Sequence, residues 1–146
     1  MNNYLSNSLL FKNLSEQEME IISNIITIRS FPANSFIFHQ DDPAEMMYVI
    51  ISGKIAIEIN KGQKKERLLE LSTNQLVGEI AFIDQSPRTA AAYCTEETVA
   101  GCITDEIWKM IRDKHPLIYQ QILENMLVYL AQMIRKTDEQ LFGNFH

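Results

Sequence analysis

The sequence has few of the residues from which metal centres and nucleophilic active sites are built. It holds 2 cysteines and 3 histidines in 146 residues. Cys94 and Cys102 form no Cys-x-x-Cys pair, the histidines form no His-x-His pair, and no Cys/His or Ser/His/Asp set has a suitable spacing. Zinc sites, iron–sulfur clusters and catalytic triads need such sets. We therefore predict no metal, no cofactor and no enzymatic activity.

Long hydrophobic runs are also missing, and so is a basic amino terminus. The longest apolar run extends from Met46 to Ile51, whereas a membrane span needs roughly 20 such residues. The first basic residue is Lys12, so the sequence does not begin like a signal peptide. We expect a cytoplasmic protein with no membrane span.

An excess of positive charge is the third absence. The chain has 13 lysines and arginines against 19 aspartates and glutamates, a formal charge of −6 at pH 7. Proteins that bind nucleic acid through its phosphates carry clustered basic residues. The basic residues at 61–67 fall on one expected hairpin tip, where solvation explains them. No direct contact with nucleic acid is predicted, although one arginine could still hold one small anion.

The remaining composition is that of an ordinary globular domain. Hydrophobic residues make up 46% of the chain and charged residues 22%, and at about 100–200 residues per domain we predict a single domain over 1–146. It divides into an N-terminal helical segment at 9–26, a β region at 27–104 and C-terminal helices at 105–141. The first helix, Leu14–Ile26, begins with the capping box Ser15–Glu18.

The β region alternates short β-branched or aromatic stretches with turn residues. Strands this short, with turns every 8–12 residues, are typical of an antiparallel sandwich or small barrel. The expected strands are Phe36–His39, Met47–Ser52, Lys54–Asn60, Leu68–Leu71, Ala90–Tyr93 and Thr98–Thr104.

Two helices follow, a short one capped by Asp105 and a long one over Pro116–Leu141. The long helix carries two adjacent apolar stripes, wider together than the roughly 100° that one packing surface requires. We therefore expect two packing partners, one of them a second copy of the chain, although burial of both stripes within one domain remains an alternative. The first stripe is Leu123, Leu127, Leu130, Ile134, Thr137 and Leu141; the second is Tyr119, Ile122, Met126, Tyr129 and Met133.

The chemically informative segment is residues 77–90, which read VGEIAFIDQSPRTA. Gly78 permits a sharp turn, after which the amides of Ile80 and Ala81 open a short helical turn where free N–H groups attract an anion. Arg88 adds a planar cation suited to phosphate oxygens. A carboxylate at Glu79 beside a phosphate makes sense if it accepts hydrogen bonds from ligand hydroxyls. Together these groups suggest a sugar phosphate.

This segment resembles the phosphate-binding cassette of the cyclic-nucleotide-binding domain family, whose pattern is Gly-Glu-(Ile/Leu)-Ala followed by Pro-Arg-(Thr/Ala)-Ala. We call residues 77–90 the cassette. The resemblance implies that Glu79 accepts from the ribose 2′-hydroxyl and that Arg88 pairs with the cyclic phosphate. It further implies amide donors at Ile80, Ala81 and Ala90 and a hydroxyl at Thr89, so that the ligand-binding residues are Gly78, Glu79, Ile80, Ala81, Arg88, Thr89 and Ala90.

The resemblance covers about residues 9–141, with departures at a few positions. Asn34 and Asp41 stand where glycines are common, and these two residue types tolerate positive φ best. Val77 replaces a usual Phe and Gln85 a frequent Gly.

The fold implied by the resemblance is mainly β with flanking helices: a double-stranded β-helix, or jelly-roll-like antiparallel barrel, with an N-terminal helix and a long C-terminal helix. The implied function is that of a cAMP or cGMP sensor without an effector domain of its own, which signals to a separate effector protein by repacking its last helix. Thr137 is a candidate for contact with the base. The alternative is a barrel that has lost its ligand, in which Glu79 and Arg88 form an internal ion pair and the last helix serves dimerisation.

Overall fold

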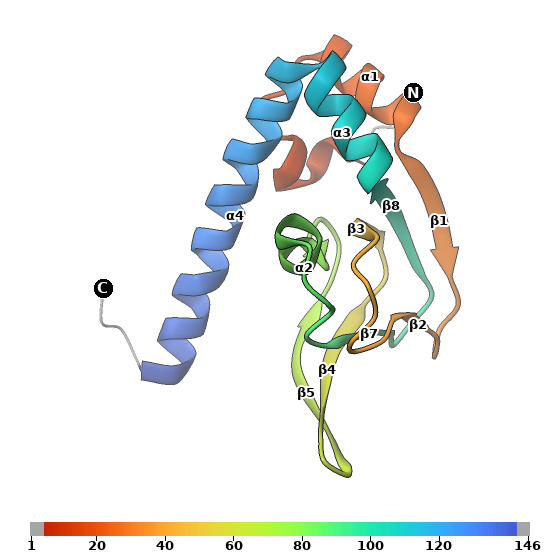
Figure 1. Ribbon diagram of the computed structural model, residues 1–146, viewed down its shortest axis with the longest axis vertical. Helices are drawn as coiled ribbons and strands as arrows, with labels where there is room; N and C mark the ends of the chain where they lie inside the picture. The colour runs from red at the N-terminus through yellow and green to blue at the C-terminus, as the bar shows by residue number, and fades with distance from the viewer. Residues whose placement is uncertain (1–4, 143–146) are drawn as a thin grey trace.

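The structure, a computed structural model, describes residues 5–142, except the side chains of 138 and 140–142. Its strands are β1 (Thr27–Phe31), β2 (Phe36–Phe38), β3 (Met46–Ser52), β4 (Ile55–Lys61), β5 (Lys64–Leu71), β6 (Leu76–Val77), β7 (Ala91–Cys94) and β8 (Thr98–Thr104). They form two antiparallel four-stranded sheets, in the orders β1-β8-β3-β6 and β2-β7-β4-β5. The predicted mainly β fold with flanking helices is confirmed (Figure 1).

The two sheets share one apolar core. Its buried residues come from β3, β6 and β8 of the first sheet and from β4, β5 and β7 of the second: Tyr48, Ile50, Ile55, Leu71, Val77, Ala92, Cys94, Ala100 and Cys102. Both cysteines are free and buried, and burial raises the pKa of the Cys102 thiol to about 11. Both thiols are thus plain residues of the apolar core.

Helices cover the opposite face of the first sheet. They are the 3₁₀ turns η1 (Leu5–Asn7) and η2 (Leu9–Phe11), and the α-helices α1 (Glu16–Ile25), α2 (Glu79–Asp84), α3 (Asp105–Lys114) and α4 (Pro116–Phe142). Their apolar side chains pack with Met47, Val49 and Ile103 of the sheet. Strand β8 is consequently buried on both faces and reads as a nearly continuous apolar run.

Side-chain caps explain where α1 and α3 begin. The predicted capping box of α1 is present, because Ser15 Oγ accepts from the Glu18 N–H and the Glu18 carboxylate accepts from the Ser15 N–H. The expected cap of α3 was wrong by one residue. Thr104 Oγ1, rather than Asp105, accepts from the Ile107 N–H at 3.1 Å, and Asp105 is the first helical residue.

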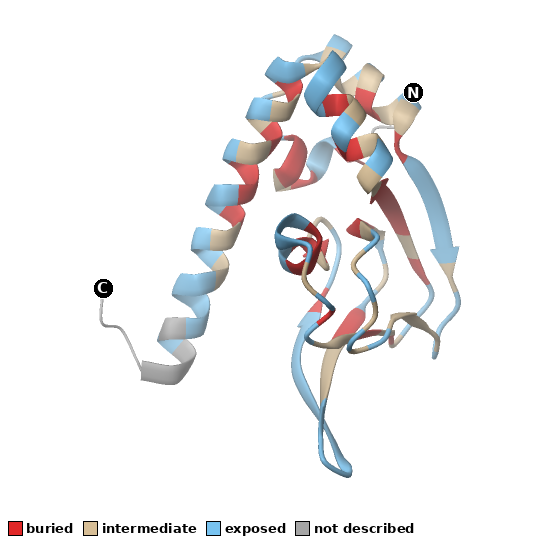
Figure 2. Ribbon diagram, in the orientation of Figure 1, coloured by how far each residue is buried: buried red, intermediate tan, exposed pale blue. Residues whose placement is uncertain are grey.

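The two stripes of α4 have different surroundings. Ile122, Met126 and Tyr129 of the second stripe are buried against the rest of the domain, whereas Leu127 and Ile134 of the first stripe are 68% and 62% exposed. Figure 2 shows buried residues along the inner side of the helix near its start and exposed ones farther along. The domain thus covers one stripe and leaves much of the other in contact with solvent; the side chain of Leu141 lies outside the described residues.

Strand β1 is additional to the expected strands, and β5 is longer than expected. Strand β1 was not predicted, because its exposed residues lack the alternating apolar pattern of a half-buried strand. It forms by pairing with β8, from Thr27↔Cys102 to Phe31↔Thr98. Strand β5 begins at Lys64, because the β4–β5 hairpin projects beyond the core and is held by backbone pairing rather than by burial (Figure 1).

Candidate functional site

A cavity of about 570 Å³ lies between α2, the β4–β5 hairpin and α4. All eight residues that the sequence analysis singled out line it: Gly78, Glu79, Ile80, Ala81, Arg88, Thr89, Ala90 and Thr137. The remaining lining residues are mostly apolar: Phe38, Ile57, Leu69, Leu71, Leu76, Tyr129, Leu130, Met133 and Ile134. The cassette therefore supplies most of the polar groups of one chamber whose other walls are apolar.

The backbone of the cassette follows the order expected from the sequence. Strand β6 ends at Val77, Gly78 turns the chain with φ +75°, α2 follows, and residues 85–90 lead into β7. The first hydrogen bond of α2 runs from the Phe82 N–H to the Gly78 carbonyl at 3.3 Å. The amides of Glu79, Ile80 and Ala81 thus precede the first intrahelical bond, as at any helix start.

Arg88 is held in the cavity wall by several contacts. The residue is 3% exposed. Nη1 donates to the Gly78 carbonyl at 2.6 Å, Nη2 donates to the Met46 carbonyl, and the guanidinium carbon lies 4.1 Å from the centre of the Phe38 ring. The buried Nε, in contrast, has no hydrogen-bond partner. A buried cation with one unused donor at a cavity is well suited to an anionic ligand.

The loop that carries Arg88 is fixed to the loop between β2 and β3. The Arg88 N–H donates to the Asp42 carbonyl at 2.8 Å, and the Asp41 N–H donates to the Arg88 carbonyl at 2.7 Å. Asp41 has φ +71°. The two loops therefore position the guanidinium through backbone bonds as well as through its own contacts.

Glu79 is a buried carboxylate that shares the cavity with Arg88. Its side chain is 9% exposed, and no ion pair joins it to Arg88 in the part of the chain that the structure describes. Burial raises the pKa of Glu79 above its ordinary value, and its own backbone and the nearby Arg88 charge oppose this only in part. Burial likewise lowers the pKa of Arg88. Both charges are thus kept at the cavity against a desolvation penalty.

Glu79→Gln is expected to stabilise the ligand-free chain at pH 7. Because the pKa of Glu79 is raised on folding, its contribution to stability is complete below the ordinary carboxyl pKa and is lost as the pH rises through the raised value. The neutral amide avoids that loss, so the melting temperature of the variant should exceed that of the unaltered chain at pH 7. The difference should shrink as the pH falls toward 4.5, the ordinary value.

Glu70→Gln is the matched control, since Glu70 lies on the exposed β5 hairpin. Its melting temperature should follow that of the unaltered chain at every pH. A lower melting temperature for Glu79→Gln at pH 7, with none for the control, would show that the carboxylate stabilises the fold.

Two residues important for the geometry were not singled out as site residues from the sequence. Phe38 stacks on Arg88, although nothing in the sequence around Phe38 indicates this contact. Tyr129 lines the cavity and hydrogen-bonds Leu76; its stripe position predicted a packed residue but not this contact. Both contacts join residues about fifty positions apart. Trp108, by contrast, packs in the apolar core.

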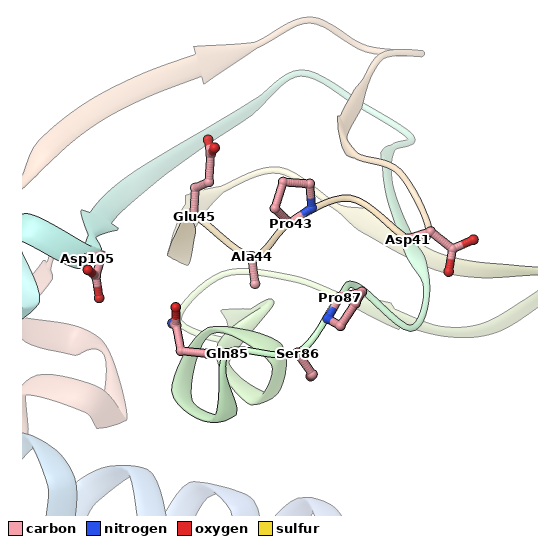
Figure 3. Close-up of a pocket in the computed structure, with 8 residues that line it drawn as sticks. All are labelled: Asp41, Pro43, Ala44, Glu45, Gln85, Ser86, Pro87 and Asp105. Carbon is pink, nitrogen blue, oxygen red and sulfur yellow. The ribbon is translucent and has the colours of Figure 1, made fainter.

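A second cavity, of about 470 Å³, lies where the β2–β3 loop and residues 85–87 face each other near the start of α3 (Figure 3). Three carboxylates line it, those of Asp41, Glu45 and Asp105, and none of its lining residues is basic. An anion is repelled by such a surface. The chamber that contains Arg88 is therefore the better site for a phosphate.

The described residues, 5–142, offer neither a metal site nor a helix that could cross a membrane. None of their His, Cys, Asp and Glu side chains form a group of three or more that could hold a metal ion. Likewise, no helix within 5–142 combines the length and the apolar character that crossing a membrane requires.

Comparison with known proteins gives a consistent result. A family model, described as the cyclic nucleotide-binding domain, matches residues 28–115. The Cyclic AMP receptor protein of Thermus thermophilus is 26% identical over 138 residues, which are 94% of this chain and 62% of that protein. The chain thus spans about three fifths of the length of this curated relative.

Solved structures show the same likeness. The Catabolite Activator Protein of Thermus thermophilus has a TM-score of 0.78 at 26% identity, covering 92% of this chain and 62% of that one. A cyclic nucleotide-binding domain from Methylobacillus flagellatus has a TM-score of 0.87 at 15% identity, covering 95% of this chain and 80% of that one. The second likeness concerns the fold alone.

Proposed function

The chain belongs to the cyclic nucleotide-binding domain family, and from this premise we propose that it binds cAMP or cGMP in the cavity lined by the cassette. The observation that carries the proposal is Arg88, a buried guanidinium at that cavity whose Nε lacks a partner. In this proposal Nε donates to the cyclic phosphate. The first-turn amides of Ile80 and Ala81 and the amide of Ala90 supply further donors.

The carboxylate of Glu79 is the proposed acceptor for the ribose 2′-hydroxyl. A hydroxyl that donates to this buried carboxylate would stabilise its ionised form, which burial alone disfavours. The base then lies in the apolar part of the cavity, between the β4–β5 hairpin and α4. Thr89 and Thr137 line that space and offer hydroxyls that donate or accept. Such groups serve adenine and guanine equally, so the proposal names both nucleotides.

We further propose that the chain is a regulatory module rather than an enzyme, and that its output is a change in the packing of α4 read by a separate effector protein. Leu130, Met133 and Ile134 of α4 line the cavity, so a nucleotide bound there touches the helix itself. A ligand that binds two arrangements of α4 unequally shifts their populations. A cytoplasmic location fits this role, because both cysteines are free and buried.

The proposed dimer forms through the exposed stripe of α4. Leu127 and Ile134 of that stripe are 68% and 62% exposed, and large apolar side chains exposed on one helix face favour association. Pairing of two such helices in a two-fold arrangement would cover them in both copies. Sedimentation velocity decides the point: a monomeric mass at micromolar chain concentration, with and without nucleotide, contradicts the dimer.

The binding proposal predicts a large thermal shift with cAMP or cGMP. A ligand at one hundred times its dissociation constant adds about 2.7 kcal/mol to the free energy of unfolding. For a chain of this size that corresponds to a rise in melting temperature of roughly 5–10 °C. The control ligand is 5′-AMP, which has the same base and sugar but an open phosphate, and it should give a much smaller shift.

The competing function is that of a barrel which binds no nucleotide and serves only to join protein partners. No shift with cAMP, cGMP or a cyclic dinucleotide at millimolar concentration would favour it and contradict the sensor. A shift of equal size with 5′-AMP would instead indicate a general phosphate site.

A further inference from the structure

Tyr129 joins the long helix to the strand that leads into the cassette. Its hydroxyl accepts a hydrogen bond from the Leu76 N–H at 3.2 Å and lies 3.4 Å from the Leu76 carbonyl, to which it donates. The side chain is 6% exposed and lines the cavity. Asn125, another buried polar residue of α4, donates instead to the carbonyls of Leu10 and Lys12 around η2. The Tyr129 hydroxyl therefore attaches α4 to the barrel by a contact separate from this anchor.

Leu76 is a position where a single hydroxyl can attach the helix to the sheet. Strand β6 is the edge of its sheet and pairs with β3, where Val49 lies opposite Leu76. The buried backbone of an edge residue needs partners on the side away from its neighbouring strand. One phenol provides both a donor and an acceptor there. The helix thus occupies the place that a further strand would take.

A short covalent path connects this contact to the cassette. Leu76 is followed by Val77 and Gly78, and the Gly78 carbonyl accepts from Arg88 Nη1 at 2.6 Å. Glu79 is the next residue and the first of α2. A displacement of Arg88 or Glu79 toward a ligand therefore acts on a segment whose beginning is bonded to α4.

The phenol keeps its proton throughout the neutral pH range. Burial, together with the charge of Glu79, raises the pKa of Tyr129 to about 12, and the Leu76 backbone opposes this only in part. The hydroxyl consequently remains a donor to the Leu76 carbonyl wherever a cytoplasmic protein works. The contact responds to the position of the cassette rather than to pH.

We propose that Tyr129 is the positioning residue that couples nucleotide binding at the cassette to the movement of α4, an inference that rests on the proposed function. The nucleotide itself is held by Arg88 and Glu79. Tyr129 passes the resulting change in β6 to the helix residues beyond it, Met133 and Ile134, which also line the cavity. Loss of the hydroxyl should then leave binding largely intact and weaken the response of the helix.

Hydrogen–deuterium exchange of the full chain with saturating cAMP or cGMP tests this inference. In the unaltered chain, nucleotide should slow exchange both in the cassette, 77–90, and in residues 126–137 of α4. In Tyr129→Phe the ring is kept, affinity should fall by no more than about tenfold, and protection of the cassette should persist. Protection of residues 126–137 should fall by half or more.

Tyr119→Phe is the matched control, because it removes the same group from the same helix at a position that does not line the cavity. It should leave both responses unchanged. The inference is overturned if Tyr129→Phe protects α4 as strongly as the unaltered chain does. It is also overturned if cassette and helix lose protection together, since Tyr129 would then stabilise the fold only. Absence of any response in the unaltered chain would overturn the proposed function itself.

Discussion

Replacing Arg88 with alanine is expected to weaken binding of cAMP or cGMP by about a hundredfold or more. Arg88 is 3% exposed, and a charge-assisted hydrogen bond is worth about 1.5–3 kcal/mol. Loss of the positive charge beside the phosphate adds to this effect, and each 1.4 kcal/mol is about a factor of ten in the dissociation constant. Isothermal titration calorimetry measures the change directly.

Arg67→Ala is the control for this variant, because it removes the same charge from the chain at an exposed position. Arg67 lies on β5, with Nη2 3.2 Å from the Glu58 carboxylate. Its loss should change nucleotide affinity by about threefold or less. An Arg88→Ala chain that folds and binds within that same range would show that Arg88 only connects the loops around it.

Arg88→Lys separates the charge from the shape of the side chain. Lysine keeps the cation, but it lacks the planar group that here serves the Gly78 and Met46 carbonyls while leaving Nε unused. We therefore expect an affinity between those of the alanine variant and the unaltered chain. If alanine at this buried position prevents folding, the lysine variant still tests whether Arg88 binds the nucleotide.

The cassette was predictable because its chemistry is local. Gly78, Glu79 and Arg88 all lie within residues 78–88. A glycine followed by a short helix fixes their relative positions with few contacts from distant segments. The same holds for positions where the chain needs positive φ. Asn34 has φ +65° and Asp41 φ +71°, and asparagine and aspartate are the residue types that tolerate positive φ best. Local conformational demands of this kind can be predicted from residue type.

The contacts that hold the cassette in place could not be predicted, because they join distant segments. The Met46 carbonyl is 42 positions from Arg88, and Leu76 is 53 positions from Tyr129. Neither a backbone carbonyl nor one aromatic residue among many carries a sequence signal for its partner. Such contacts depend on how the two sheets and α4 pack, which the apolar pattern limits only to a face of each element.

The missed strand β1 and the early part of β5 illustrate the same limit. Their residues are largely exposed on both faces, so the sequence shows no alternation of apolar and polar side chains. In β5, cross-strand ion pairs such as Lys61–Glu66, with 3.0 Å between Nζ and the carboxylate, accompany the backbone pairing. Strands stabilised by their neighbours rather than by burial are the ones that periodicity does not detect.

Gly78→Ala is expected to reduce both the stability of the chain and its affinity for nucleotide. With φ at +75°, an alanine here is strained by about 1–2 kcal/mol. Its Cβ would overlap Nη1 of Arg88 and lie 3.0 Å from Cζ of the same arginine. The Cβ would also lie 3.1 Å from Cε2 of Phe38. The guanidinium cannot yield easily, because it is buried, bonded to two carbonyls and stacked on Phe38. Such overpacking adds about 1–3 kcal/mol.

Gly62→Ala separates the two effects, because Gly62 has nearly the same backbone angle, φ +67°, and an added Cβ would meet no atom within 4 Å. It should show the backbone strain alone and bind nucleotide normally. The difference between the two variants in free energy of unfolding then measures the displacement of Arg88, and we expect a loss of nucleotide affinity of tenfold or more in Gly78→Ala only. Equal stability and equal affinity in both variants would mean that Arg88 moves aside freely, which its contacts to Gly78, Met46 and Phe38 do not allow.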